Sequence, residues 1–247
     1  MSFSANCAVV IPCLNEAEAV GAVVTGAREQ VGCVVVVDDG STDGTATKAR
    51  KAGGNVIRRE TSGGKGSALS TGFAHADRLG FEWALAMDGD GQHSPKDIPR
   101  FFARAATTEA RLIVGNRMER TDNMPALRRR TNQWLSRKLS RFCGRDWPDS
   151  QCGFRMVHLE SWRKLEFTSE HFEIESELLV RFARAGFGIE FVPVQTRYAS
   201  ERSKIRPLRD TIRWLRWWNG IRREFAAERK AALIFSEGPD VSSATVD

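Results

Sequence analysis

Short apolar segments alternate with amphipathic segments through roughly the first half of the chain. The Val- and Ile-rich segments at residues 7–14 and 33–37 and the apolar segment at 83–87 have the length and composition of buried strands. Because strands that alternate with helices form parallel pairs, the pattern predicts an α/β fold whose mostly parallel central sheet has helices on both faces. The predicted strands are 7–14, 33–37, 55–57, 83–87 and 112–114, and the predicted helices are 18–30, 45–52, 65–79 and 98–107.

The alternation ends after Asn116. A loop leads into a basic helix that begins near residue 126, and the turn-rich segment "GRDWPDSQCGFRMV" becomes extended toward its end. A helix at 172–185, a strand at 189–194 and a second basic helix at 207–229 follow. We therefore expect one α/β domain over residues 1–204, a basic amphipathic helical extension over 205–232, and a disordered tail over 233–247.

The composition is that of a globular protein, with 41% hydrophobic and 28% charged residues. No apolar run approaches the roughly 18 residues that cross a bilayer, and no basic segment precedes the first apolar one. We therefore expect neither a membrane span nor a secretory signal. The five cysteines include no CxxC motif, which indicates reduced thiols in a cytoplasmic protein.

The net charge of +6 is unevenly distributed. Residues 1–110 carry 11 Lys and Arg against 13 Asp and Glu, whereas residues 111–247 carry 26 against 18. The basic second part predicts an anionic partner, which the charge alone leaves open between phosphates, a membrane surface and nucleic acid.

Polar clusters follow three of the predicted strands. Asn15 and Glu16 follow the first, Asp38 and Asp39 the second, and the sequence "DGDGQH" follows the strand at 83–87. In a parallel sheet these ends lie at one edge, where α/β proteins bind their ligands. The convergence favours a binding site over three unrelated turns.

The segment that begins at Asp88 allows three interpretations: a calcium loop, a catalytic metal site or a polar turn. An EF-hand loop fails, because its sixth position is His93 and its twelfth is Pro99. Asp88, Asp90 and Gln92 offer only oxygen atoms, which suits Mg²⁺ or Mn²⁺. We expect His93 to be a neighbour of such an ion rather than a ligand.

Other nucleotide and hydrolase motifs do not fit. The segment "GGKGS" is no P-loop, since Arg59 and Gly66 stand where glycine and Ser or Thr are required. Neither G-x-S-x-G nor H-E-x-x-H occurs in the sequence.

An ordered set of motifs does fit one family. The segments "VVIPCLNEAEAV", "VVVVDDGSTDGT", "GGKGSAL", "LAMDGDGQHSP", "VGNR", "DSQCGFRMV" and "EIESELL" follow one another in that order. With them, residues 5–205 resemble the family 2 glycosyltransferases of GT-A (Rossmann-like) fold, and most closely the branch that glycosylates polyprenyl phosphates of the dolichol type.

The resemblance implies a metal-dependent, inverting hexosyltransferase with a nucleotide-sugar donor. Mg²⁺ or Mn²⁺ would be bound by Asp88, Asp90 and Gln92. Asp39 would contact the base or ribose, although it could equally cap its own turn, and we expect Lys65 to be a solvated side chain. The donor could be GDP-mannose, UDP-glucose or UDP-N-acetylglucosamine. The nucleotide-sugar pocket would comprise Pro12, Asn15, Glu16, Asp39, Gly66, Asp88, Gly89, Asp90, Arg197 and Lys204, with the glycine-rich segment 63–66 allowing backbone to approach the ligand.

The resemblance also assigns an acceptor. Arg117 and Arg128 match positions that hold the acceptor phosphate in the family, and arginine suits bidentate phosphate binding. Asp149, Gln151 and Cys152 match a motif that shapes the site. The general-base motif of relatives with saccharide acceptors is missing, which favours a phosphate acceptor, already nucleophilic at neutral pH.

The basic helix at 207–229 carries tryptophans opposite arginines. This pattern is typical of a helix at an anionic membrane surface, but it also fits a helix packed on its own domain. We expect a peripheral enzyme at the cytoplasmic face of the membrane and no nucleic-acid partner. The alternatives are a glycosyltransferase with a saccharide acceptor and a basic nucleic-acid-binding domain without catalysis.

Overall fold

The structure is a computed structural model, and it describes residues 3–119, 121, 124–196 and 207–236. The chain forms two compact units, Met1–Arg202 and Ser203–Asp247. The first unit contains a seven-stranded sheet and all but one of the described helices; the second contains one long helix.

The sheet confirms the predicted mixed α/β fold. Its strand order is β3-β2-β1-β4-β6-β5-β7, and every neighbouring pair is parallel except those that involve β6, which is antiparallel to β4 and to β5. The sequence had indicated that the segment before residue 158 is extended, but not its place between two parallel strands. The strands are β1 Cys7–Cys13, β2 Cys33–Asp38, β3 Asn55–Arg58, β4 Trp83–Ala86, β5 Ala110–Asn116, β6 Arg155–His158 and β7 Gly188–Pro193.

The helices agree with the predicted ones to within a few residues at each end, except that α9 ends at Ser236 rather than at residue 229. Two short helices, α1 and α7, were not predicted, because four or five residues are too few to show a helical period. The helices are α1 Phe3–Asn6, α2 Val20–Arg28, α3 Thr45–Lys51, α4 Lys65–Arg78, the 3₁₀ turn η1 Pro95–Asp97, α5 Ile98–Thr107, α6 Ala126–Cys143, α7 Leu159–Arg163, α8 Ile174–Arg184 and α9 Pro207–Ser236.

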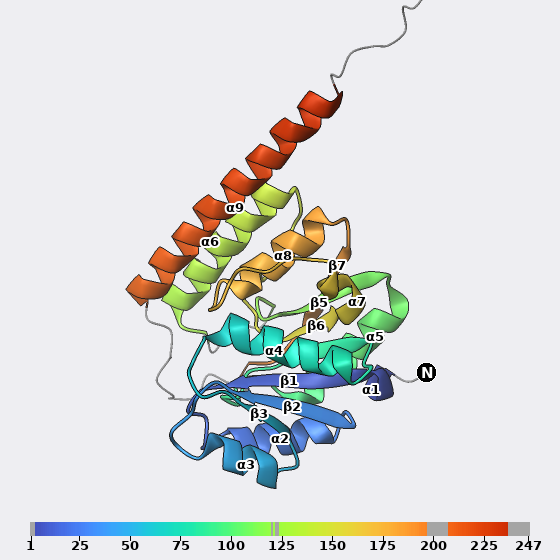
Figure 1. Cartoon of the computed structure of the whole chain (residues 1–247), viewed down its shortest axis with the longest axis vertical. Helices are drawn as coiled ribbons and strands as arrows, with labels where there is room; N and C mark the ends of the chain where they lie inside the picture. The colour runs from blue at the N-terminus through green and yellow to red at the C-terminus, as the bar shows by residue number, and fades with distance from the viewer. Residues whose placement is uncertain (1–2, 120, 122–123, 197–206, 237–247) are drawn as a thin grey trace, which may run out of the picture. The chain divides into compact units, whose positions relative to one another are not determined.

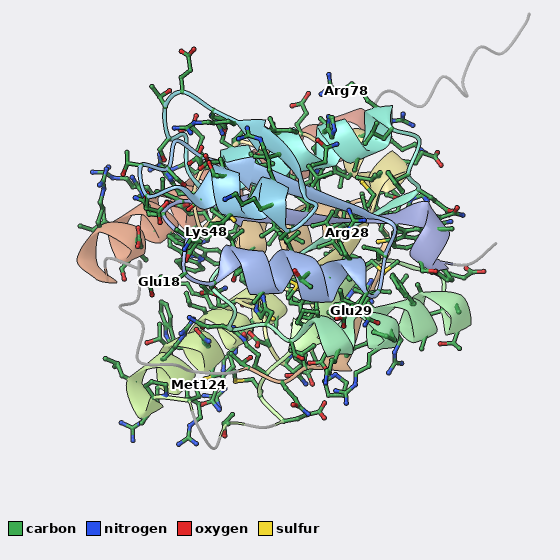
Figure 2. All side chains as sticks on the ribbon, turned by 90° about the horizontal axis from the view of Figure 1, so that it is seen from below. Glu18, Arg28, Glu29, Lys48, Arg78 and Met124 are labelled. Carbon is green, nitrogen blue, oxygen red and sulfur yellow. The ribbon has the colours of Figure 1, made fainter. Side chains whose placement is uncertain are left out.

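Helices cover both faces of the sheet, with α4 on one side of β1 and β2 and with α2 and α3 on the other (Figure 1). The contact between α4 and β1 is close, because a Cβ on Gly72 would lie 2.3 Å from Cγ1 of Val10. The outer side of α2 and α3 is charged: Arg28, Glu29 and Lys48 are exposed there (Figure 2). Burial of the apolar side chains on the inner side is the main force that holds these layers together.

The antiparallel strand β6 determines which loops meet. Ala86, the last residue of β4, pairs with Arg155, the first residue of β6. The residues that precede Arg155 therefore lie beside the residues that follow Ala86, which include Asp88. This pairing places the motif "DSQCGF" beside the end of β4.

The second unit is the helix α9, which extends through Ser236; the rest of the predicted tail lies outside the described residues. Trp214, Trp218, Ile221 and Phe225 are spaced to share one side of the helix, and the rings of Trp214 and Trp218 stack with centroids 5.4 Å apart. Within the described residues, no helix combines the length and the hydropathy needed to cross a bilayer.

Candidate functional site

The ends of β1, β2 and β4 meet at one edge of the sheet, as the alternation of strands and helices predicted. The Asp39 N–H donates to the carbonyl of Cys13 over 2.8 Å, and the Asn15 N–H donates to Ser41 Oγ over 2.9 Å. A Cβ on Gly89 would lie 2.5 Å from Sγ of Cys13 and 3.4 Å from Cγ of Glu16. The Gly89 backbone thus packs directly on the residues that end β1.

The two aspartates that end β2 have different partners. Asp38 caps its own turn, since its Oδ1 accepts the N–H of Ser41 at 2.9 Å. Asp39 instead accepts hydrogen bonds from Ser62 Oγ at 2.7 Å and from the N–H groups of Gly63 and Gly64 at 3.0 and 2.8 Å. The suggestion that Asp39 caps the turn is therefore wrong, because that position belongs to Asp38. Its contact with a nucleotide stays a prediction.

The glycine-rich loop at 63–66 packs against a second segment of the chain. A Cβ on Gly66 would lie 2.2 Å from the carbonyl oxygen of Ser169, and the Ser67 N–H donates to the carbonyl of Glu170 over 3.1 Å. The close backbone approach that was predicted for a ligand is made at Gly66 by residues 169–170. Glu177, fully buried in α8, fixes that segment by accepting the N–H of Ser169 at 2.8 Å.

Lys65, the first residue of α4, lies between two carboxylates. Its Nζ is 2.6 Å from Oδ1 of Asp88 and 2.8 Å from Oε1 of Glu175, and its side chain is only 14% exposed. The expectation that Lys65 is solvated is therefore wrong. A Cβ on Gly153 would lie 2.7 Å from the same Nζ, so the backbone of the "DSQCGF" motif closes over the ion pairs.

Asp88 and Lys65 shift each other's pKa values. Burial alone would raise the pKa of Asp88, but the cations Lys65 and Arg117 hold it well below its usual range. Burial alone would lower the pKa of Lys65, but Asp88 and Glu175 hold it above its usual value. Asp88 and Lys65 are therefore both charged at neutral pH.

The buried side chain of His93 lies next to Asp88. Its Nδ1 accepts the N–H of Asp88 at 3.3 Å, and its ring stacks on Phe154 with centroids 5.0 Å apart. Burial lowers the pKa of His93 to about 4; Asp88 opposes this effect, and the cations Arg117, Lys65 and Arg128 add to it. His93 is thus a neutral neighbour of Asp88, and the charges of Arg117, Lys65 and Arg128 all disfavour its protonation.

The loop after β4 offers oxygen atoms to a divalent ion. Asp90 Oδ1 accepts the N–H of Gln92 at 2.9 Å across a turn in which Gly91 has a φ of +77°. Among the described residues, no group of three or more His, Cys, Asp or Glu side chains is arranged to bind a metal. Two carboxylates with a nearby amide suit an ion that takes its remaining ligands from substrate phosphates and water, as Mg²⁺ usually does.

Arg117 is bound to Asp149. The pair is bidentate, with Nε–Oδ2 and Nη2–Oδ1 distances of 2.7 and 2.8 Å, and both side chains are buried. Burial alone would raise the pKa of Asp149, but Arg117 keeps it below its usual value. Gln151 and Cys152 follow in the same loop, where the Gln151 side chain donates to Ser176 Oγ at 3.1 Å. The predicted residues Asp149, Gln151 and Cys152 thus lie beside Arg117.

Arg155 is a buried residue that the sequence analysis did not single out. Its Nε donates to the carbonyl of Cys152 at 2.6 Å, its Nη2 to that of Ser150 at 2.7 Å, and its Nη1 to that of Glu175. It therefore joins the "DSQCGF" loop to the start of α8. A charged residue within the extended apolar segment "GFRMV" was the available signal.

Three further predicted residues lie in the described part of the chain. Pro12 is half-buried in β1, and Arg128 is half-buried in the first turn of α6. Asn15 is exposed, has a φ of +54°, and accepts the Thr42 N–H through its Oδ1 at 2.9 Å. Arg197 and Lys204 lie outside the described residues.

Comparisons with known proteins identify the family. The family model described as "Glycosyl transferase family 2" matches residues 8–165. The dolichyl-phosphate hexose transferase of Haloferax volcanii is 30% identical over 81% of this chain and 86% of its own length. The undecaprenyl-phosphate mannosyltransferase of Micrococcus luteus is 28% identical over 75% of this chain and 81% of its own.

A solved structure has a similar fold. Glucosyl-3-phosphoglycerate synthase from Mycobacterium tuberculosis, in complex with Mn²⁺, UDP and phosphoglyceric acid, superposes with a TM-score of 0.64. The match covers 86% of this chain and 75% of that one at 23% identity.

Proposed function

Since the chain belongs to glycosyl transferase family 2 and has the GT-A fold, we propose that it transfers a hexose, with inversion, from a nucleotide-sugar to a polyprenyl phosphate. One observation carries this proposal: Asp88, which follows β4, is ion-paired with Lys65 at 2.6 Å beside the buried His93, and Arg117 and Arg128 are near enough to lower the pKa of that imidazole. Carboxylates beside several cations are what a metal-assisted transfer between two phosphate-bearing molecules requires. Family membership decides for an enzyme over the nucleic-acid-binding alternative.

The donor lies at the ends of β1, β2 and β4. Asp88, Asp90 and Gln92 would hold Mg²⁺ or Mn²⁺, which would offset the charge that the diphosphate gains as the glycosidic bond breaks. Pro12, Asn15, Glu16 and Asp39 surround the nucleoside. In support, Asp39 already fixes the glycine loop next to Lys65, and the similar mycobacterial structure contains Mn²⁺ and UDP.

The acceptor phosphate is held by Arg117 and Arg128. One of its oxygens attacks the anomeric carbon from the side opposite the leaving diphosphate, which inverts the configuration. The phosphate monoester is already an anion at neutral pH, so no general base is required. Asp149 orients the Arg117 guanidinium through two hydrogen bonds. Relatives named for dolichyl and undecaprenyl phosphates support this class of acceptor.

A lipid acceptor requires contact with the membrane, and exposed apolar side chains next to cations support it. On α6, Leu127 is 78% and Trp134 is 51% exposed, and Lys138 Nζ lies 4.7 Å from the Trp134 ring. Such a surface suits the interface of an anionic bilayer. We propose that α6 binds the cytoplasmic face of the membrane peripherally, and that the basic helix α9 binds the same face independently of it.

Donor-binding calorimetry tests the donor half. We expect one of GDP-mannose, UDP-glucose and UDP-N-acetylglucosamine to bind in the presence of Mn²⁺. Its affinity should fall at least about tenfold with EDTA, which removes the metal, and in Asp88→Asn, which removes a carboxylate ligand of the metal. Glu160→Gln, which removes an exposed carboxylate that pairs with Lys164, is the matched control. The donor that binds is then used for transfer to a polyprenyl phosphate, and failure of all three donors to bind contradicts the proposal.

A further inference from the structure

The Lys65 side chain forms an ion pair with Asp88, the carboxylate that is proposed to hold the metal. The Lys65 ammonium lies 2.6 Å from Asp88 and 2.8 Å from Glu175, and a phenyl ring, that of Phe172, lies 5.7 Å from the same nitrogen. The Glu175 side chain is 7% exposed and that of Asp88 is 27% exposed. One positive charge is therefore enclosed between two negative ones in a site largely shielded from solvent.

We propose that Lys65 is a positioning residue that makes metal binding conditional on the nucleotide: it neutralises Asp88 in the empty enzyme and releases it only when a diphosphate arrives with the metal. This inference rests on the proposed function, and it goes beyond it by naming the group that couples the two ligands.

The physical reason is charge balance. A divalent ion that binds Asp88 without a nucleotide would be placed close to the Lys65 ammonium, and repulsion between cations is strong where water is scarce. A diphosphate brings negative charges that compensate both cations at once. Metal and nucleotide should therefore each bind weakly alone and strongly together, which is a positive coupling between the two ligands.

The surroundings keep Lys65 at the site in either state. Gly63 and Gly64, which precede it, donate their N–H groups to Asp39, and the Ser67 N–H donates to Glu170. The carbonyl of Glu175 is held by the Arg155 guanidinium. Because both backbones are fixed, Lys65 can keep Glu175 as a partner when Asp88 turns to another cation.

The test is a titration of the full-length protein with Mn²⁺, followed by the electron paramagnetic resonance signal of free Mn²⁺, with and without saturating GDP or UDP. The ratio of the two Mn²⁺ dissociation constants measures the coupling. In the wild type we expect Mn²⁺ to bind at least about tenfold more tightly with one of the nucleotides.

Lys65→Met should bind Mn²⁺ alone at least about tenfold more tightly than the wild type, because the competing charge is gone. Its coupling ratio should shrink correspondingly. Lys65→Met leaves two carboxylates facing each other, so Lys65→Met/Glu175→Gln is measured beside it; in that variant Asp88 is the one residue of the three that remains charged. Lys65→Arg should retain the coupling. Lys164→Met, which removes an exposed lysine paired with Glu160, is the matched control.

The outcomes separate this inference from the function on which it rests. If the wild type binds Mn²⁺ with a nucleotide but neither Lys65→Met nor Lys65→Met/Glu175→Gln gains affinity for Mn²⁺ alone, the role of Lys65 is overturned and the proposed function stands. If the wild type binds no Mn²⁺ even with GDP, UDP or their sugar derivatives, both are overturned.

Discussion

Arg117 and Asp149 form a buried, bidentate ion pair, and the Arg117 backbone N–H also donates to Asp149 at 3.2 Å. One side chain follows β5 and the other begins the "DSQCGF" loop, so the pair joins two segments that are distant in sequence. It fixes the guanidinium that we propose for the acceptor phosphate. Three contacts to one carboxylate make this relationship a sensitive point of the fold.

Asp149→Ala should lower the free energy of unfolding by about 3–5 kcal/mol, because it leaves the Arg117 charge buried without its partner. Urea denaturation measures the change. Glu160→Ala removes a carboxylate whose ion pair with Lys164 is exposed, and it should change the stability by less than about 1 kcal/mol. Equal effects of the two substitutions would contradict the importance of the buried pair.

The same pair predicts a pH dependence. The pKa of Asp149 is lower in the folded chain than its usual value, because Arg117 outweighs the effect of burial. Such a carboxyl contributes stability that is fully present above its unfolded pKa of about 3.9 and is lost as the pH falls toward its folded pKa. The stability difference between the wild type and Asp149→Asn should therefore stay constant from neutral pH to about pH 5 and shrink below about pH 4. Urea denaturation across this pH range measures the stability difference, and a difference that grows in acid would contradict the prediction.

Gly66→Ala should destabilise the chain by about 1–3 kcal/mol, since the added Cβ meets the Ser169 carbonyl oxygen at 2.2 Å and backbone must shift. Gly21, in α2, has nothing within 4 Å of an added Cβ. Gly21→Ala should thus be neutral or stabilising by up to about 1 kcal/mol. Thermal unfolding of the two variants compares them directly, and a Gly66→Ala protein as stable as Gly21→Ala would show that residues 169–170 do not pack there.

Arg155→Lys should cost on the order of 2 kcal/mol or more, because an ammonium cannot reach all three carbonyls that the guanidinium satisfies. The substitution should also weaken donor binding, since Arg155 holds Glu175 and the "DSQCGF" loop at the site. Arg163→Lys is the control, as Arg163 makes an exposed ion pair with Asp77. Calorimetry of the donor with both variants tests the second part, and equal donor affinities would limit Arg155 to a structural role.

The local features of the fold could be predicted from the sequence. A run such as Cys33–Asp38, rich in valine, specifies a buried strand through its own side chains, and the helix α4 begins where the glycine-rich loop ends. Asp88 and Asp90 were recognised as metal-ligand candidates because the oxygens and their spacing are properties of six consecutive residues. The order of strands and helices also placed three polar strand ends at one edge of the sheet.

The tertiary structure decided which distant segments pair. Strand β6 has only four residues, Arg155–His158, and its place between β4 and β5 depends on partners that its own sequence does not specify. That placement brings Gly153 against Lys65, whose partners Asp88 and Glu175 belong to different elements. Secondary structure was set by the sequence itself because helical and strand periods are local. The partners of each buried charge were decided by the fold, because burial and ion pairing are properties of the packed chain.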